Sequence, residues 1–147
     1  MREILFRGLE TYFGNEWIVG RLIADDVIVP SGQPFELDDY CLLAGELEAY
    51  QVKPETVGQF TGLTDKNGVK IFEGDIVEYV TGGKTRLGRV FFSDFRSSFS
   101  VTAAKNGSAR INNDLYHYIQ NGNSVTVIGN IHDNPEVFGG DDNAQEM

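Results

Sequence analysis

The sequence predicts a mostly β protein built from small β units. Three observations predict it: 17 glycines in 147 residues, short apolar runs rich in β-branched and aromatic residues, and Asn-Gly or Gly-Gly signals between the runs. The hydrophobic content of 41% and the aromatic content of 12% are typical of a folded globular chain. Because short strands joined by tight turns are typical of small barrels, we expect an SH3-like barrel in the C-terminal part.

The N-terminal segment predicts three strands, at residues 4–7, 16–24 and 27–29. Gly14-Asn15 and Asp25-Asp26 supply the turns between them. Gly20 lies within the second run, where an isolated glycine predicts a bulge. The Pro30-Ser31-Gly32-Gln33-Pro34 segment ends the third strand.

Residues 35–52 fit either a helix or a hairpin. A helix would begin with Asp38 as its N-cap and would place four apolar side chains on one face, namely Leu42, Leu43, Leu47 and Tyr50. A hairpin would pair residues 40–43 with 47–52 around Gly45. Since a glycine inside a helix costs about 1 kcal/mol relative to Ala, we favour the hairpin.

The segment 57–79 combines turn and strand chemistry most densely. Asn67 and Gly68 tolerate the positive φ of a tight turn, and Asp65 can close an Asx turn on the backbone two residues later. A strand at 69–72, a corner at Glu73-Gly74-Asp75 and a strand at 76–80 follow. We expect the turn and corner positions to shape the barrel; they are Gly58, Gly62, Asp65, Asn67, Gly68, Glu73, Gly74 and Asp75.

Further strands are expected at residues 86–93, 99–104, 116–119 and 125–131. Pro54 holds the preceding Lys53 in an extended conformation, which suits a boundary between two units. We therefore predict an N-terminal β subdomain at 1–53, a candidate for oligomerisation, and a small barrel at 54–138. The polar, Gly-led residues 139–147 are expected to be a disordered tail.

Three blocks of sequence carry a resemblance to a known family. They are PETVGQFTGLTDKNGVKIFEGDIV at residues 54–77, MREILFRG at 1–8 and VIGNIHDNPE at 127–136. Together they resemble the YopX family of phage and prophage proteins. The resemblance implies a phage or prophage origin, an intracellular location and self-association. It implies no activity, and so it transfers no catalytic residue to this chain.

Charge is unevenly distributed along the chain, whose net charge is −10. Residues 1–83 hold 6 basic and 15 acidic side chains (net −9), residues 84–110 hold 6 and 1 (net +5), and residues 111–147 hold 0 and 6 (net −6). The whole molecule should repel nucleic acid at long range. The basic segment is the best candidate surface for nucleic acid or a protein partner, through Lys84, Arg86, Arg89, Arg96, Lys105 and Arg110.

No motif supplies a complete catalytic, cofactor or metal site. Gly83-Lys84-Thr85 lacks the earlier glycine of a phosphate-binding loop, and a calcium loop starting at Asp65 would put Lys70 where glycine is required. His117, His132 and Cys41 are too few for a structural zinc site, which normally uses four ligands. Glu73 and Asp75 are more often structural than catalytic in such a corner.

Cys41 is the one cysteine, and neither a secretion signal nor an apolar run of about 18 residues is visible. We therefore expect a soluble protein of the bacterial cytoplasm, with no membrane partner and no cofactor.

We predict a protein that self-associates and acts by binding rather than catalysis, with another phage protein or a host protein as a further possible partner. One alternative is a nucleic-acid-binding accessory factor that uses residues 84–110. The other is an acidic decoy that occupies a host DNA-binding protein.

Overall fold

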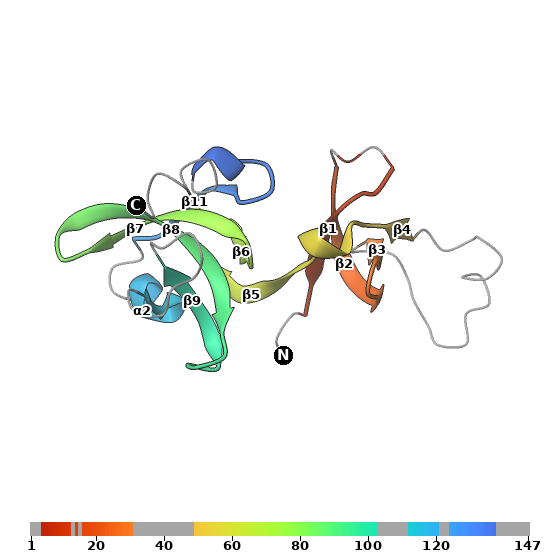
Figure 1. Ribbon diagram of the computed structural model, residues 1–147. Coiled ribbons are helices and arrows are strands. Elements are labelled where there is room, and N and C mark those ends of the chain that lie inside the picture. Colours follow the sequence, from red (N-terminus) through yellow and green to blue (C-terminus); the bar gives the residue numbers. More distant parts are fainter. Residues whose placement is uncertain are drawn as a thin grey trace. The chain divides into compact units, whose positions relative to one another are not determined.

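The computed structural model describes residues 4–12, 14, 16–30, 49–102, 112–120 and 124–137 (Figure 1). The chain divides into two compact units, 1–60 and 61–147. The division falls inside strand β5 (Gly58–Thr64), whereas the sequence suggested a boundary at Pro54. The predicted tail at 139–147 lies outside the described residues.

The N-terminal unit is an antiparallel sheet. Its strands are β1 (Phe6–Leu9), β2 (Trp17–Ala24), β3 (Val27–Pro30) and β4 (Tyr50–Gln51). They run in the order β4-β3-β2-β1, and the first residues of β5 pair with the other side of β1. Ile18, Ile28 and Val52 form the centre of its buried core. The predicted strands at 4–7, 16–24 and 27–29 are therefore confirmed, with bounds shifted by a few residues.

A short 3-10 helix, η1 (Pro54–Thr56), connects β4 to β5. The Thr56 hydroxyl accepts a hydrogen bond from the Leu9 N–H at 2.8 Å and donates one to the Lys53 carbonyl at 2.6 Å. This one side chain thus ties the connection to the end of β1. Of the ambiguous residues 35–52, only 49–52 are described, and the choice between hairpin and helix lies outside them.

Gly20 is not a bulge, contrary to the sequence prediction. It lies in regular register opposite Phe6 on one side and Pro30 on the other. The irregular step of β2 lies between Leu22 and Ala24 instead. Glycine is required at position 20 because a Cβ there would overlap the backbone carbonyl oxygen of Val29.

The C-terminal unit contains a second antiparallel sheet. Its strands are β7 (Asp75–Thr81), β8 (Lys84–Ser93), β9 (Ser98–Thr102), β10 (Asn112–Asp114) and β11 (Thr126–Asn130), in the order β10-β9-β8-β7-β11. Strand β6 (Lys70–Phe72) pairs with β5, and a 3-10 helix, η3 (Pro135–Val137), follows β11.

The mostly β class is confirmed, with two antiparallel sheets and one short α-helix among the described residues. The predicted SH3-like barrel is not found as a closed barrel in that part of the chain. Strands β10 and β11 stand at opposite ends of the strand order and do not pair with each other.

The core of the C-terminal unit lies against one face of this sheet. Eight buried side chains form it: Ile71, Val77, Tyr79, Val90, Val101, Leu115, Tyr118 and Val125. Two of them, Leu115 and Tyr118, come from helix α2 (Leu115–Gln120).

The prediction of a strand at residues 116–119 was wrong. Leu115 and Tyr118 are three residues apart, so a helical turn brings both to the sheet while Tyr116 and His117 stay exposed. The Asp114 carboxylate accepts a hydrogen bond from the Tyr116 N–H at 2.9 Å, which stabilises the start of the helix. No helix in the described part of the chain is long and apolar enough to cross a membrane.

We expect Gly20→Ala to destabilise the N-terminal unit by about 2 kcal/mol or more, since the obstructing atom is backbone and cannot rotate away. Trp17, the one tryptophan of the chain, lies in the same strand, so urea unfolding followed by its fluorescence measures this effect. Gly82→Asn is a suitable control, because nothing lies within 4 Å of a Cβ there and Asn tolerates the positive φ of 60°. Equal unfolding midpoints for Gly20→Ala and the parent protein would contradict the close approach.

Candidate functional site

Asp65 holds together two segments that are far apart in sequence. Its side chain is 3% exposed. One carboxylate oxygen accepts the N–H groups of Asn67 at 2.8 Å and Val69 at 2.9 Å, which is the predicted Asx turn. The other accepts the Val127 N–H of β11 at 2.9 Å. Both oxygens are therefore occupied by backbone donors, and the residue has a structural role.

Burial raises the pKa of the Asp65 carboxyl, but the hydrogen bonds from Val127, Val69 and Asn67 and the charge of Lys66 outweigh burial. The resulting pKa lies below the ordinary value of 3.8. The ionised carboxylate is thus the form that the folded protein stabilises.

The corner before β7 is the second structural point. The Asp75 carboxylate, 1% exposed, accepts the Phe72 N–H at 2.8 Å. Gly74 adopts a φ of 90°, donates its N–H to the Val90 carbonyl and accepts the Ile131 N–H. The predicted corner is confirmed, and it joins β8 to the turn that follows β11.

That turn is held together by the side chains of Asn130 and Asn134. The Asn130 side-chain oxygen accepts the N–H groups of His132 and Asp133, and its amide donates to the Asp133 carboxylate at 3.1 Å. The Asn134 side-chain oxygen in turn accepts the Asn130 N–H at 3.2 Å. The Asn-Ile-His-Asp-Asn run favours such a turn, since Asn and Asp side chains form local hydrogen bonds with the backbone.

The structure does not gather the predicted basic residues on one surface. Lys84, Arg86 and Arg89 lie in β8, and Arg96 lies in the loop between β8 and β9, where its N–H donates to the Ser93 hydroxyl. Lys105 and Arg110 lie outside the described residues. Arg86 is opposite Tyr79, whereas Arg89 is opposite Ile76 and Thr102, so Arg86 and Arg89 point to opposite faces of the sheet.

The face that carries Arg86 is the core face, and its centre is a pair of tyrosines. The Tyr79 and Tyr118 rings lie 4.7 Å apart with an interplanar angle of 51°. Burial raises the pKa of both phenols, while the Arg86 charge opposes this on both and Arg96 opposes it on Tyr118. Arg86 and Arg96 are both exposed, so they lie where this aromatic core meets solvent.

The opposite side of the β7–β8 hairpin is named here the outer face, defined by Glu78, Val80, Leu87 and Arg89. The register assigns them to one side, because Glu78 pairs with Leu87 and Ile76 pairs with Arg89. Val80 is 41% exposed and Leu87 is 40% exposed. The solvent-exposed face of an antiparallel sheet normally carries polar residues. A binding site on this face would explain why two apolar side chains are exposed there.

Arg89 is the unusual charge of the outer face. Its side chain is half-buried, and its Nε is buried without a hydrogen-bond partner. Burial lowers the pKa of its guanidinium. Because buried donors are nearly always paired in native proteins, an unpaired Nε is a place where a partner is expected.

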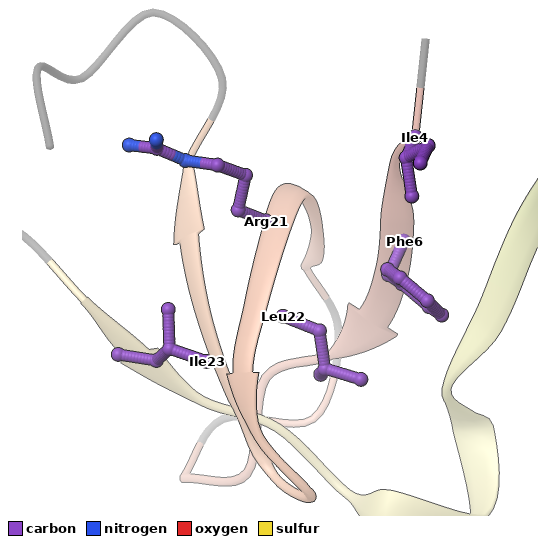
Figure 2. Close-up of a pocket in the computed structure, with 5 residues that line it drawn as sticks. All are labelled: Ile4, Phe6, Arg21, Leu22 and Ile23. Atoms are coloured by element: carbon purple, nitrogen blue, oxygen red, sulfur yellow. The ribbon is translucent and has the colours of Figure 1, made fainter. Parts of the chain in front are cut away.

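The N-terminal unit has an open hollow of about 330 Å³ beside β1 and β2 (Figure 2). Five side chains line it: Ile4, Phe6, Arg21, Leu22 and Ile23. Four of the five are apolar, and Arg21 is the one charged group. The hollow offers apolar contact but no set of converging polar groups, so it is a weaker candidate than the outer face.

Within the described residues, no three His, Cys, Asp or Glu side chains gather as metal ligands would. The Asp75 carboxylate accepts a backbone N–H of the corner, which supports its structural interpretation, and Glu73 also takes part in an interaction.

A protein-family model described as "YopX protein" matches residues 24–138, which is most of both units. The chain belongs to the YopX family. The resemblance found in the sequence is thereby confirmed.

The fold of this YopX chain is similar to that of a solved structure, "Crystal structure of protein EF1440 from Enterococcus faecalis". The TM-score is 0.55 at 24% sequence identity, and the alignment covers 93% of this chain and 99% of EF1440. At this identity the likeness concerns the fold. No curated protein matches the sequence.

We expect Asp65→Asn to destabilise this YopX-family chain by about 1–3 kcal/mol at pH 7, because an amide group replaces one acceptor of buried N–H groups. The Asp65 carboxyl has a pKa near 3.8 in the unfolded chain and a lower pKa in the folded protein. Its contribution to the free energy of unfolding is therefore complete above pH 3.8 and is lost as the pH falls through the folded pKa. The difference between variant and parent should therefore shrink on acidification, as measured by urea unfolding from pH 7 to pH 3. Asp94→Asn, at an exposed position, is the matched control. A stability difference between Asp65→Asn and the parent that does not change with pH would contradict a role for the ionised carboxylate.

Proposed function

We propose that the protein acts by binding, and that its first partner is a second copy of itself. The observation that supports this best is the outer face of the β7–β8 hairpin. Val80 and Leu87 lie there diagonally across two paired strands and are both exposed. The main core cluster of the unit packs on the other side of these strands. On the side of Arg89, Ile76 and Thr102 are also buried, so the exposed part of the outer face lies toward the tip of the hairpin.

Two physical arguments favour a protein partner for this face. Since Val80 is 41% exposed and Leu87 is 40% exposed, burying the exposed part of each side chain on association would contribute roughly 0.6–1.2 kcal/mol. A pleated sheet face also suits packing against a second sheet face, which keeps the backbone hydrogen bonds intact and interdigitates side chains. A second copy supplies such a face without any further component.

Several expectations from the sequence belong to this proposal. A binding role without catalysis fits a molecule in which backbone N–H groups engage the buried carboxylates of Asp65 and Asp75. An SH3-like character of the C-terminal sheet would suit it, because small curled sheets frequently serve as binding modules. A place in the bacterial cytoplasm, as the family resemblance implies, would put it among phage or host proteins.

We expect the protein to associate with itself in solution. Leu87→Ser should raise the dissociation constant about tenfold or more, because apolar burial is lost. Sedimentation velocity over a wide concentration range measures both. Val69→Ser is the control, because Val69 is equally apolar, is 47% exposed and lies at the β5–β6 turn of the same unit. A parent protein that stays monomeric up to its solubility limit would refute self-association.

A second candidate function is binding of single-stranded nucleic acid at the core-face edge. The observation that favours it is the position of Arg86 and Arg96, which both act electrostatically on Tyr118. Exposed aromatic side chains lie in the same strand and loop, namely Phe92 in β8 and Phe95 in the β8–β9 loop, and Tyr116 is exposed on helix α2. Cations with aromatic rings are the chemistry that holds backbone phosphates and stacked bases.

For this candidate we expect retention of a short oligonucleotide at low salt, with a steep loss as salt rises. The double variant Arg86→Ala with Arg96→Ala should weaken binding and reduce the salt slope by about 1.4, since each lost phosphate contact in a single strand accounts for about 0.7. Arg89→Ala should leave affinity unchanged, because Arg89 points to the opposite face. Fluorescence anisotropy tests this, and no binding at low salt would exclude the candidate.

A further inference from the structure

The outer face combines one unpaired cation with one exposed anion in a self-complementary arrangement. Glu78 pairs with Leu87, and Arg89 lies two residues further along β8, so Glu78 and Arg89 are diagonal neighbours on one face. Diagonal neighbours have Cβ atoms about 7–8 Å apart. The Arg89 Nε nevertheless has no hydrogen-bond partner in this structure, and Glu78 is exposed.

A half-buried guanidinium of this kind requires an acceptor. Its Nε is already shielded from water, and burial is the sole cause of its lowered pKa. A carboxylate is the acceptor that matches the guanidinium geometry best. Since the chain has 22 acidic and 12 basic residues, a second copy is a partner rich in carboxylates.

We propose that two copies pack outer face to outer face about a two-fold axis, with Arg89 of each copy paired to Glu78 of the other. This inference rests on the proposed self-association and names its surface. A two-fold interface brings each residue against its complement twice, so the two ion pairs form reciprocally. Leu87 of each copy would then lie beside the pairs and Val80 further toward the tip of the hairpin, and the pairs would fix which apolar faces meet.

The decisive experiment uses charge reversal in two separate variants. Arg89→Glu places two acidic groups on each outer face, and Glu78→Arg places two basic groups there. Each variant alone should lose association by more than about tenfold, because like charges meet across the two-fold axis. An equimolar mixture should associate again, since every acidic group then faces a basic one. A role of Arg89 within its own chain cannot produce this rescue.

Sedimentation velocity of the parent, both variants and the mixture gives the answer, with circular dichroism and thermal melting as checks of folding. Arg86→Glu is the matched control, a charge reversal three residues away on the opposite face, and it should leave association unchanged. Should Arg89→Glu fail to fold, Arg89→Met keeps the aliphatic stem and must still weaken association more than about tenfold, whereas Arg86→Met must not.

The outcomes separate the two proposals. A monomeric parent protein would overturn self-association itself. A parent that associates, with both folded single variants associating equally well, would leave self-association standing and overturn the outer-face interface. Folded single variants that stay monomeric even when mixed would overturn the reciprocal Arg89–Glu78 pairing.

Discussion

The buried carboxylate of Asp65 is the constraint on which the C-terminal unit depends. It accepts N–H groups from its own turn and from Val127, which is 62 residues away in the chain. Val127 belongs to β11, and β11 pairs with β7. One side chain therefore connects the β5–β6 turn to the far edge of the sheet. Ionised acceptors make stronger hydrogen bonds than neutral ones, which suits a group that must hold a link of this sequence separation.

The corner at Gly74 and Asp75 completes this framework and thereby sets the orientation of the β7–β8 hairpin. Gly74 exchanges backbone hydrogen bonds with Val90 and Ile131. With the start of β7 fixed, strand alternation sends Val77 and Tyr79 to the core and Glu78 and Val80 to the outer face. The candidate interface thus follows from buried polar residues that do not belong to it.

The sequence predicted the structure well where a conformation depends on neighbouring residues, and less well where it depends on a strand that is distant in the chain. The Asp65 turn and the Gly74 corner could be predicted, because Asp, Asn and Gly act on their immediate neighbours. Gly20 was predicted as a bulge, but its requirement comes from the Val29 carbonyl of the next strand. Helix α2 was missed because only the packed core distinguishes Leu115 and Tyr118 from an alternating strand.

The candidate site illustrates the same limit. The basic residues are adjacent in sequence, yet alternation in β8 sends Arg86 and Arg89 to opposite faces, as the pairing with Tyr79 and Ile76 establishes. The unpaired state of Arg89 depends on which strands surround it, and no linear pattern reports that.

The position of β11 has a consequence for how the chain folds during synthesis. The strands that form the N-terminal unit are all made once residue 60 has left the ribosome. The C-terminal sheet, in contrast, lacks β11, which pairs with the edge of β7 that β8 leaves open, until residues 126–130 emerge. Until then the edge of β7 is unpaired and the Asp65 carboxylate lacks its Val127 donor. Nascent chains in this interval expose a free strand edge, which is the state most prone to wrong pairing.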